Sequence, residues 1–115
     1  VPLGQNSTRP VVYGDGEQLR DFCYVDNVVY ANILAALYDE KLSGSTFNVG
    51  TGDSRSINSL CSELNTISPT YEQKRPGDVL CSQADISKIS SLLGYKVVVD
   101  FETGIKKTLK YYLEN

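Results

Sequence analysis

Apolar residues recur at helical spacing in four segments of the chain. The pattern is clearest from Ile57 to Leu64, where apolar residues stand at positions i, i+3, i+4 and i+7 behind Ser56, a residue type favoured at helix N-caps. The same spacing behind Asp26 and Asp85 predicts two further helices, and a fourth closes the chain. The predicted helices are residues 28–41, residues 57–64, residues 86–93 with Gly94 at the C-terminal end, and residues 101–112.

Short runs of β-branched and aromatic residues between these helices predict strands. They are residues 11–13, residues 21–25, residues 46–49 and residues 97–99, with a few extended residues after Pro69. The first two runs are separated by a loop with two glycines, which tolerate positive φ, so we expect a hairpin. Strands and helices alternate without an internal repeat, which predicts a small mixed α/β fold: a hairpin plus short strands packed with about four helices.

Length and composition set the class of protein. The 115 residues suit one domain, so we expect residues 9–115 to fold as a unit and residues 1–8, polar and rich in turn formers, to form a loop or stub. A content of 41% apolar and 22% charged residues is typical of a soluble globular protein. The net charge of −3 and the scattered basic residues favour neither nucleic acid nor membrane as a partner.

Three cysteines, Cys23, Cys61 and Cys81, lie far apart without a CxxC spacing, and the chain has no histidine. We therefore expect no metal site, and interpret the cysteines as reduced core residues of a cytoplasmic protein. The first residues lack the pattern of a signal peptide, which agrees with that localisation.

The sequence contains no recognisable catalytic centre. None of its eight tyrosines has a lysine four residues later, the spacing by which an ammonium activates a phenol for hydride chemistry. The absence of histidine removes the usual base of nucleophilic triads. Residues 14–16 and residues 50–52 each read Gly-X-Gly, but neither continues as the dinucleotide fingerprint, so we interpret both as turns. We expect no catalytic or cofactor-binding residue in this chain.

Two arginines remain as candidate binding residues. Arg75 stands on a loop stiffened by Pro76, and a guanidinium on rigid backbone suits bidentate recognition of a diphosphate. Asp78 follows within one turn, and either accepts from ribose hydroxyls or pairs with that arginine. Arg20, next to Asp21, either faces a ligand or is a strand-end charge paired locally. The residues alone thus support a phosphate-bearing small-molecule ligand.

Four segments taken in order carry a resemblance to a known family. They read "VVYGDGEQLRDFCYVDNV", "FNVGTGDSRSINSL", "RPGDVLCSQADISKISSLLGY" and "DFETGIKKTLKYYLEN". From about Arg9 to Asn115 the chain resembles the C-terminal, substrate-binding portion of NAD-dependent epimerases and dehydratases, which are extended short-chain dehydrogenases. Within that family it looks most like the UDP-N-acetylglucosamine and UDP-glucose 4-epimerases.

The resemblance implies roles for individual residues. The backbone of Val11, Val12 and Tyr13 would contact the uracil of the substrate. Arg20 would bind the diphosphate or the ribose, Arg75 the diphosphate, and Asp78 the ribose. Asp21 and the turn at Asn48 and Gly50 would be structural, and Asp26 would cap a helix. The family's NAD loop and its catalytic tyrosine and lysine belong to a Rossmann half that this sequence lacks.

The implied parent is an isomerase of nucleotide-sugar metabolism and polysaccharide biosynthesis, homodimeric, with NAD held by the Rossmann half. It would oxidise the sugar C4 hydroxyl, let the keto sugar rotate, and return the hydride to the other face. This chain would supply the part that binds the UDP-sugar and would hold no cofactor itself. Two alternatives stay open: the substrate domain of a nucleotide-sugar dehydratase or decarboxylase, and a noncatalytic interaction module that displays an apolar face.

Overall fold

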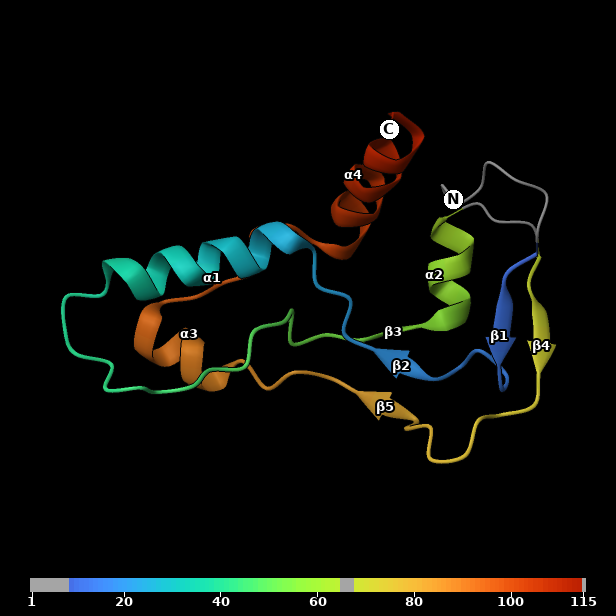
Figure 1. Ribbon diagram of the computed structural model, residues 1–115, viewed down its shortest axis with the longest axis horizontal. Helices are drawn as coiled ribbons and strands as arrows, with labels where there is room; N and C mark the ends of the chain where they lie inside the picture. Colours follow the sequence, from blue (N-terminus) through green and yellow to red (C-terminus); the bar gives the residue numbers. More distant parts are fainter. Residues whose placement is uncertain (1–8, 65–67, 115) are drawn as a thin grey trace.

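The computed structural model describes residues 9–64 and 68–114, and the predicted stub at residues 1–8 lies outside these ranges. The elements appear in chain order in Figure 1. They are β1 (Val11–Tyr13), β2 (Leu19–Arg20), α1 (Val25–Leu37), β3 (Arg55–Ser56), α2 (Ile57–Glu63), β4 (Thr70–Glu72), β5 (Cys81–Ser82), α3 (Ser87–Leu93) and α4 (Phe101–Glu114). The small mixed α/β class with four helices in the described residues is confirmed.

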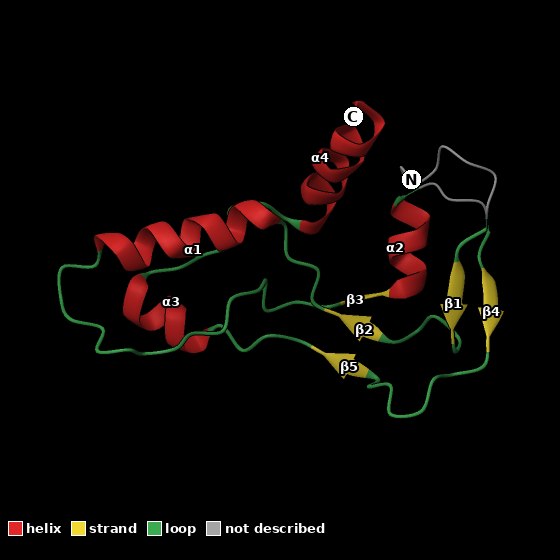
Figure 2. Cartoon of the chain, in the orientation of Figure 1, coloured by secondary structure: helices red, strands yellow, loops and turns green. Residues whose placement is uncertain are grey.

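The strands form two small sheets at the end of the molecule opposite α1 and α3 (Figure 2). In one sheet β1 runs parallel to β4, with Val12 opposite Tyr71. In the other, β2 lies between β3, which is antiparallel, and β5, which is parallel. Arg20 is therefore opposite Arg55 on one side and Ser82 on the other.

The predicted hairpin is wrong, because the first two strands belong to different sheets. The loop between them bonds to other parts of the chain: Gly14 N–H donates to the Glu72 carbonyl, and Gly16 carbonyl accepts from Asn58 N–H at the start of α2. Backbone groups used in this way cannot close a hairpin. The second strand is also earlier and shorter than predicted, Leu19–Arg20 instead of residues 21–25.

Two further predicted strands, residues 46–49 and residues 97–99, are not strands. In the second segment the buried Asn27 side chain takes the place of a ladder partner, because its Oδ1 accepts from Val98 and Val99 N–H at 2.9 and 3.0 Å and its Nδ2 donates to the Val99 carbonyl at 2.9 Å. The first segment has no ladder partner among the described residues. The extended residues expected after Pro69 are confirmed as β4.

Local helix signals gave mixed results. Ser56 caps α2 as predicted, its Oγ accepting from Ser59 N–H at 3.0 Å. Gly94 ends α3 with φ of 72°. The Asp26 prediction is wrong: the N-cap of α1 is Tyr24, two residues before Asp26. The helix begins at Val25 rather than at residue 28, and it ends at Leu37 rather than near residue 41. The N-cap of α3 is Ile86, although the Asp85 carboxylate accepts from Ser87 N–H at 3.0 Å.

The main hydrophobic core lies between α1 and α3. Its buried residues are Ala31, Ile89, Leu93 and Tyr95, against which partly buried residues of α1 and of the segment before Gly50 pack. Phe101 at the start of α4 contacts Phe22 with ring centroids 5.8 Å apart, which joins α4 to the chain that leaves β2. No helix within residues 9–64 and 68–114 is long and apolar enough to cross a membrane.

Candidate functional site

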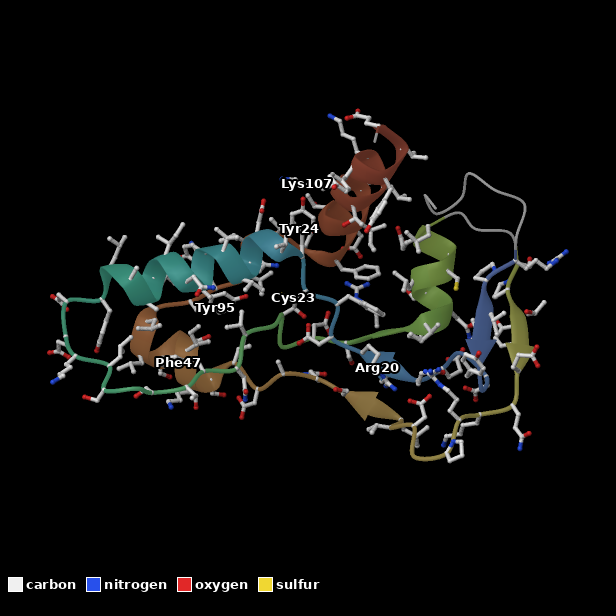
Figure 3. The ribbon with its side chains drawn as sticks, in the orientation of Figure 1. Arg20, Cys23, Tyr24, Phe47, Tyr95 and Lys107 are labelled. Carbon is white, nitrogen blue, oxygen red and sulfur yellow. The ribbon has the colours of Figure 1, made fainter. Side chains whose placement is uncertain are left out.

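The two predicted ligand-facing segments meet through an ion pair. Arg20 Nη2 lies 2.9 Å from Asp78 Oδ1, and both side chains are largely buried, with 26% and 16% of their surface exposed. Arg20 Nη1 donates to its own strand at the Leu19 carbonyl, 2.8 Å away. Figure 3 places Arg20 on β2. Because both side chains are partly buried, solvent screens this pair less than it screens an exposed surface ion pair.

Arg75 does not pair with Asp78, which was one of the two arrangements expected for Asp78; it lies over the ring of Tyr13 instead. Its guanidinium carbon lies 4.6 Å above the centre of the Tyr13 ring, a cation–π geometry. The turn between the two loop residues is closed by Asp78 N–H donating to the Arg75 carbonyl at 3.3 Å, with Gly77 at φ of 78°. The carboxylate of Asp78 thus pairs with Arg20 of β2, and the guanidinium of Arg75 packs on Tyr13 of β1.

Two cavities adjoin the Arg20–Asp78 pair. A cavity of about 230 Å³ is lined by Tyr13, Asp78 and neighbouring residues of both loops. A wider depression of about 660 Å³ is lined by Arg20 and by polar residues after β5, with Asn48 on its other wall. Since Asp78 lines the first and Arg20 lines the second, the ion pair stands at the boundary between them.

The outer edge of β1 is open. Pro10 and Gly14 bond to β4, so the ladder uses the edge of β1 that faces β4. On the opposite edge Gln18 Nε2 donates to the Tyr13 carbonyl at 2.9 Å, and no strand among the described residues pairs there. The Val12 side chain is buried, whereas those of Val11 and Tyr13 are exposed.

The structure thus brings four of the six predicted residues together: Tyr13, Arg20, Arg75 and Asp78. Val11 and Val12 share the strand with Tyr13, but Val12 contributes its side chain to the core. Sequence reasoning missed Gln18 and Lys74, which line the smaller cavity. The basic Lys74-Arg75 pair was the available signal for Lys74, and nothing local distinguished Gln18.

Asp21 has the structural role expected of it. Its carboxylate accepts from Thr51 N–H at 3.0 Å, Thr51 Oγ1 at 2.6 Å, Gly52 N–H at 3.1 Å and Ala84 N–H at 3.2 Å. A Cβ on Gly50 would lie 2.7 Å from Asp21 Oδ2, so glycine is required by this close approach.

The same contacts decide whether the Gly50–Gly52 turn fits the pyrophosphate of NAD. Amide groups at such a turn would bind phosphate only if they were free to donate. Here the amides of Thr51 and Gly52 already donate to Asp21. The turn does not fit the cofactor, and the Gly14–Gly16 segment leads into a strand rather than a helix.

The cysteines differ in environment. Burial, with a smaller effect from the Asp21 charge, raises the pKa of the Cys23 thiol, so this group stays protonated near neutral pH. Cys81 is exposed, and its assignment to the core is therefore wrong. Within residues 9–64 and 68–114 the cysteines form no disulfide, and no cluster of three or more potential metal ligands occurs there.

The chain matches a protein-family model over most of its length. The family model described as GDP-mannose 4,6 dehydratase matches residues 3–108. The curated dTDP-glucose 4,6-dehydratase of Salmonella typhimurium is 34% identical over 117 aligned residues, which cover 90% of this chain and 32% of that protein. The chain thus spans about a third of the length of the curated relatives it matches.

Solved structures of similar fold include sugar-nucleotide epimerases. The UDP-glucose 4-epimerase of Thermotoga maritima, solved with UDP-glucose, has a TM-score of 0.83 and 37% identity, covering 94% of this chain and 36% of its own. The UDP-glucuronic acid 4-epimerase of Bacillus cereus, solved with UDP-glucuronic acid and NAD, has a TM-score of 0.85 and 27% identity, covering 94% and 36%.

Proposed function

Since this chain belongs to the GDP-mannose 4,6-dehydratase family of NAD-dependent enzymes that modify nucleotide sugars, we propose that it is the part of a UDP-sugar 4-epimerase that binds the substrate. The observation that carries the proposal is the cluster of Tyr13, Arg20, Arg75 and Asp78, drawn from three separate segments. Two guanidinium groups, an aromatic ring and a carboxylate that lie close together are suited to binding a nucleoside diphosphate.

The diphosphate would bind at Arg75. Within the described residues Arg75 has no carboxylate partner, whereas the charge of Arg20 is offset by Asp78. An incoming phosphate therefore meets an uncompensated positive charge at Arg75, on a loop whose backbone turn is closed by the Asp78 N–H bond to the Arg75 carbonyl. Arg20 and Asp78 would hold the junction between diphosphate and ribose.

The uracil would lie along the open edge of β1. Backbone amides and carbonyls on a free strand edge supply donors and acceptors that match the edge of a pyrimidine. The exposed Tyr13 ring beside them adds a stacking surface. Val11 and Tyr13 would thus act through their backbone, as the family resemblance implies, whereas the backbone of Val12 faces β4 and its side chain is buried.

In the complete enzyme NAD would supply the oxidation and return of the hydride at C4. The residues of this chain would bind and orient the nucleotide, and the groups that hold NAD and transfer protons would lie in the two thirds of the relatives' length that this chain does not span. The complete enzyme is also proposed to be a homodimer and to function in the cytoplasm.

A dTDP-sugar 4,6-dehydratase is the second candidate. It is favoured by the 34% identity to the dTDP-glucose 4,6-dehydratase of Salmonella typhimurium. The two candidates differ in the nucleotide: UDP has a ribose and an unmethylated base, whereas dTDP has a deoxyribose and a methylated base. A noncatalytic interaction module is the third candidate, and it binds neither nucleotide.

Titration of the isotope-labelled chain with UDP, dTDP and NAD, followed by NMR, tests the proposal. Because only part of the substrate's environment is present, we expect a dissociation constant for UDP on the order of 1 mM, roughly −4 kcal/mol. UDP should shift the amides of Val11, Val12 and Tyr13 and of residues 75–78, and NAD should leave residues 50–52 unmoved. Tighter binding of dTDP would favour the dehydratase, and shifts confined to helix faces would favour the interaction module.

The Arg75→Ala variant tests the central contact. Loss of a charge-assisted hydrogen bond costs about 1.5 kcal/mol at an exposed position, so UDP affinity should fall about tenfold. Lys110→Ala, which removes an exposed positive charge from α4, is the matched control and should bind UDP like the wild type. Equal affinity for the Arg75→Ala variant and the wild type would show that Arg75 is a surface charge without a role in binding.

A further inference from the structure

We infer that Asp21 is a positioning residue that sets the register of β5 against β2 and thereby holds Asp78 at Arg20. Its effect on ligand binding rests on the proposed function, whereas its effect on the ion pair does not. Asp21 directly follows Arg20 and lines the wider depression beside it, but it lies outside the smaller cavity that Tyr13 and Asp78 line. Its carboxylate oxygens already accept from Thr51, Gly52 and Ala84, so we assign its influence on the ion pair to the backbone that these bonds position.

The ladder between β2 and β5 is too short to define its own register. It consists of two residue pairs, Leu19 with Cys81 and Arg20 with Ser82, supplemented by Leu19 N–H donating to the Leu80 carbonyl at 2.8 Å. Strand register is normally fixed by alternating buried side chains over a longer run or by a tight turn. Neither exists here: both residues of β5 are exposed, and 60 residues separate β2 from β5.

The Asp21 carboxylate supplies the missing constraint. It accepts from Ala84 N–H at 3.2 Å, two residues beyond the end of β5, and from the amides of Thr51 and Gly52 on the other side. All of these partners are donors, so a carboxylate with acceptors only is the matching group. One side chain therefore ties β2, β5 and the turn at residues 50–52 to a common point.

That point is connected to the hydrophobic core. The buried Tyr95 hydroxyl donates to the Gly50 carbonyl at 2.7 Å. A Cβ on Gly50 would lie 2.7 Å from both Asp21 Oδ2 and the Ala84 Cβ, so the three segments are packed as closely as their atoms allow. The turn at residues 50–52 thus bonds to Tyr95 of the core through the Gly50 carbonyl and to Asp21 through the amides of Thr51 and Gly52.

A shift in register would separate the ion pair. Asp78 precedes Ser82 in the chain leading into β5, and a slip of one residue moves a strand by roughly 3.3 Å. The Arg20 to Asp78 distance of 2.9 Å would then exceed hydrogen-bonding reach. Removing the Asp21 acceptors should therefore release Arg20 from Asp78 without any change to either residue.

The test compares Asp21→Asn with Asp53→Asn in the full 115-residue chain. The first substitution replaces one carboxylate oxygen with an amide N–H₂, which cannot pair with the donors around it, whereas Asp53 lies in the same turn but its side chain is 69% exposed. The readout is the NMR signal of the Arg20 guanidinium, first in the absence of ligand. Asp78→Asn in the wild-type background calibrates how far this signal moves when the pair is broken.

We expect Asp21→Asn to move the Arg20 signal to the position seen in Asp78→Asn, and the double variant to move it little further. Amides of Ile89 and Tyr95 in the core should keep their shifts, and Asp53→Asn should leave Arg20 unchanged. A folded Asp21→Asn variant with a wild-type Arg20 signal would overturn the inference.

If Asp21→Asn does not fold, Thr51→Val decides the question, because it removes the 2.6 Å Oγ1 donor and leaves both turn amides in place. A partial displacement of the Arg20 signal supports the inference, and an unchanged signal overturns it. UDP affinity is measured afterwards and should fall about tenfold in Asp21→Asn. A wild-type chain that fails to bind UDP would contradict the proposed function. The Arg20 signals recorded without ligand would still test the role of Asp21, because they do not depend on UDP binding.

Discussion

Asn27 is the buried polar residue on which the segment before α4 depends. It is fully buried, and its amide group makes three hydrogen bonds to the backbone of Val98 and Val99. These bonds replace the ladder that residues 97–99 lack. A single side chain on α1 thereby fixes where the chain turns from α3 toward α4.

Replacing Asn27 with alanine should lower the free energy of unfolding by about 1 to 3 kcal/mol, because two amides and one carbonyl in a partly buried segment would lose their partners. Urea unfolding monitored by circular dichroism measures the change. Asn32→Ala is the control on the same helix, since Asn32 is exposed and bonds only to the Val28 carbonyl of its own helix. Equal stability of the two variants would show that water replaces the lost bonds at residues 98–99.

The N-terminus of α4 shows how an element is stabilised by a local charge. Asp100 Oδ1 accepts from Thr103 N–H at 2.8 Å, the arrangement of an N-cap. Hydrogen bonds from Thr103 lower the pKa of Asp100, with smaller contributions from the positive charges of Arg55 and Lys106. The folded state therefore favours the ionised carboxylate.

This shift predicts a pH dependence with a definite sign. Because the folded pKa lies below the ordinary value of 3.8, the stabilisation is complete above pH 3.8 and is lost as the pH falls through the folded pKa. Thermal unfolding between pH 5 and pH 2 should show a smaller decrease in midpoint for Asp100→Asn than for the wild type. Parallel curves for Asp100→Asn and the wild type would contradict the cap.

The molecule as a whole is flatter and more open than a compact domain of its length. Its principal extents are 51 × 36 × 19 Å, and its radius of gyration is 16.8 Å. A compact chain of this length would have a radius of gyration of about 13 Å. Apolar side chains on one face of α1 contribute to the exposed surface: Val25, Val28, Val29, Ile33 and Leu37.

Substitutions at neighbouring positions of α1 should therefore have opposite consequences. Ile33→Lys should leave the free energy of unfolding within about 0.5 kcal/mol and should reduce self-association, because half of Ile33 is exposed. Leu34→Lys should destabilise the fold by about 2 to 4 kcal/mol, because Leu34 packs against the core of Ile89 and Tyr95. Urea unfolding and analytical ultracentrifugation measure the two effects. A loss of stability in Ile33→Lys equal to that in Leu34→Lys would show that this face is covered.

Local patterns located the four helices but only some of their ends, since neither Asp26 nor Asp85 is an N-cap. The spacing of apolar residues located all four, and Ser56 and Gly94 marked two termini, because capping and backbone preference act within a few residues. Arg20, Arg75 and Asp78 were also selected from sequence, because guanidinium and carboxylate groups offer the same hydrogen-bonding chemistry wherever their loop lies, and their role in binding stays a prediction. The family resemblance rested on the order of such local motifs.

Pairing between distant segments required the folded chain. The sequence pattern could not show that β1 pairs with β4 or that Asp78 pairs with Arg20, 58 residues away in the chain. Nor could it show that the Asn27 side chain hydrogen-bonds to the backbone of residues 98–99, more than 70 residues away. Strand partners and buried ion pairs are selected by which groups come within hydrogen-bonding distance after the core has formed, and sequence spacing carries no information on that distance. Residues 46–49 have the composition of a strand, yet composition cannot provide the neighbouring strand with which a ladder must be made.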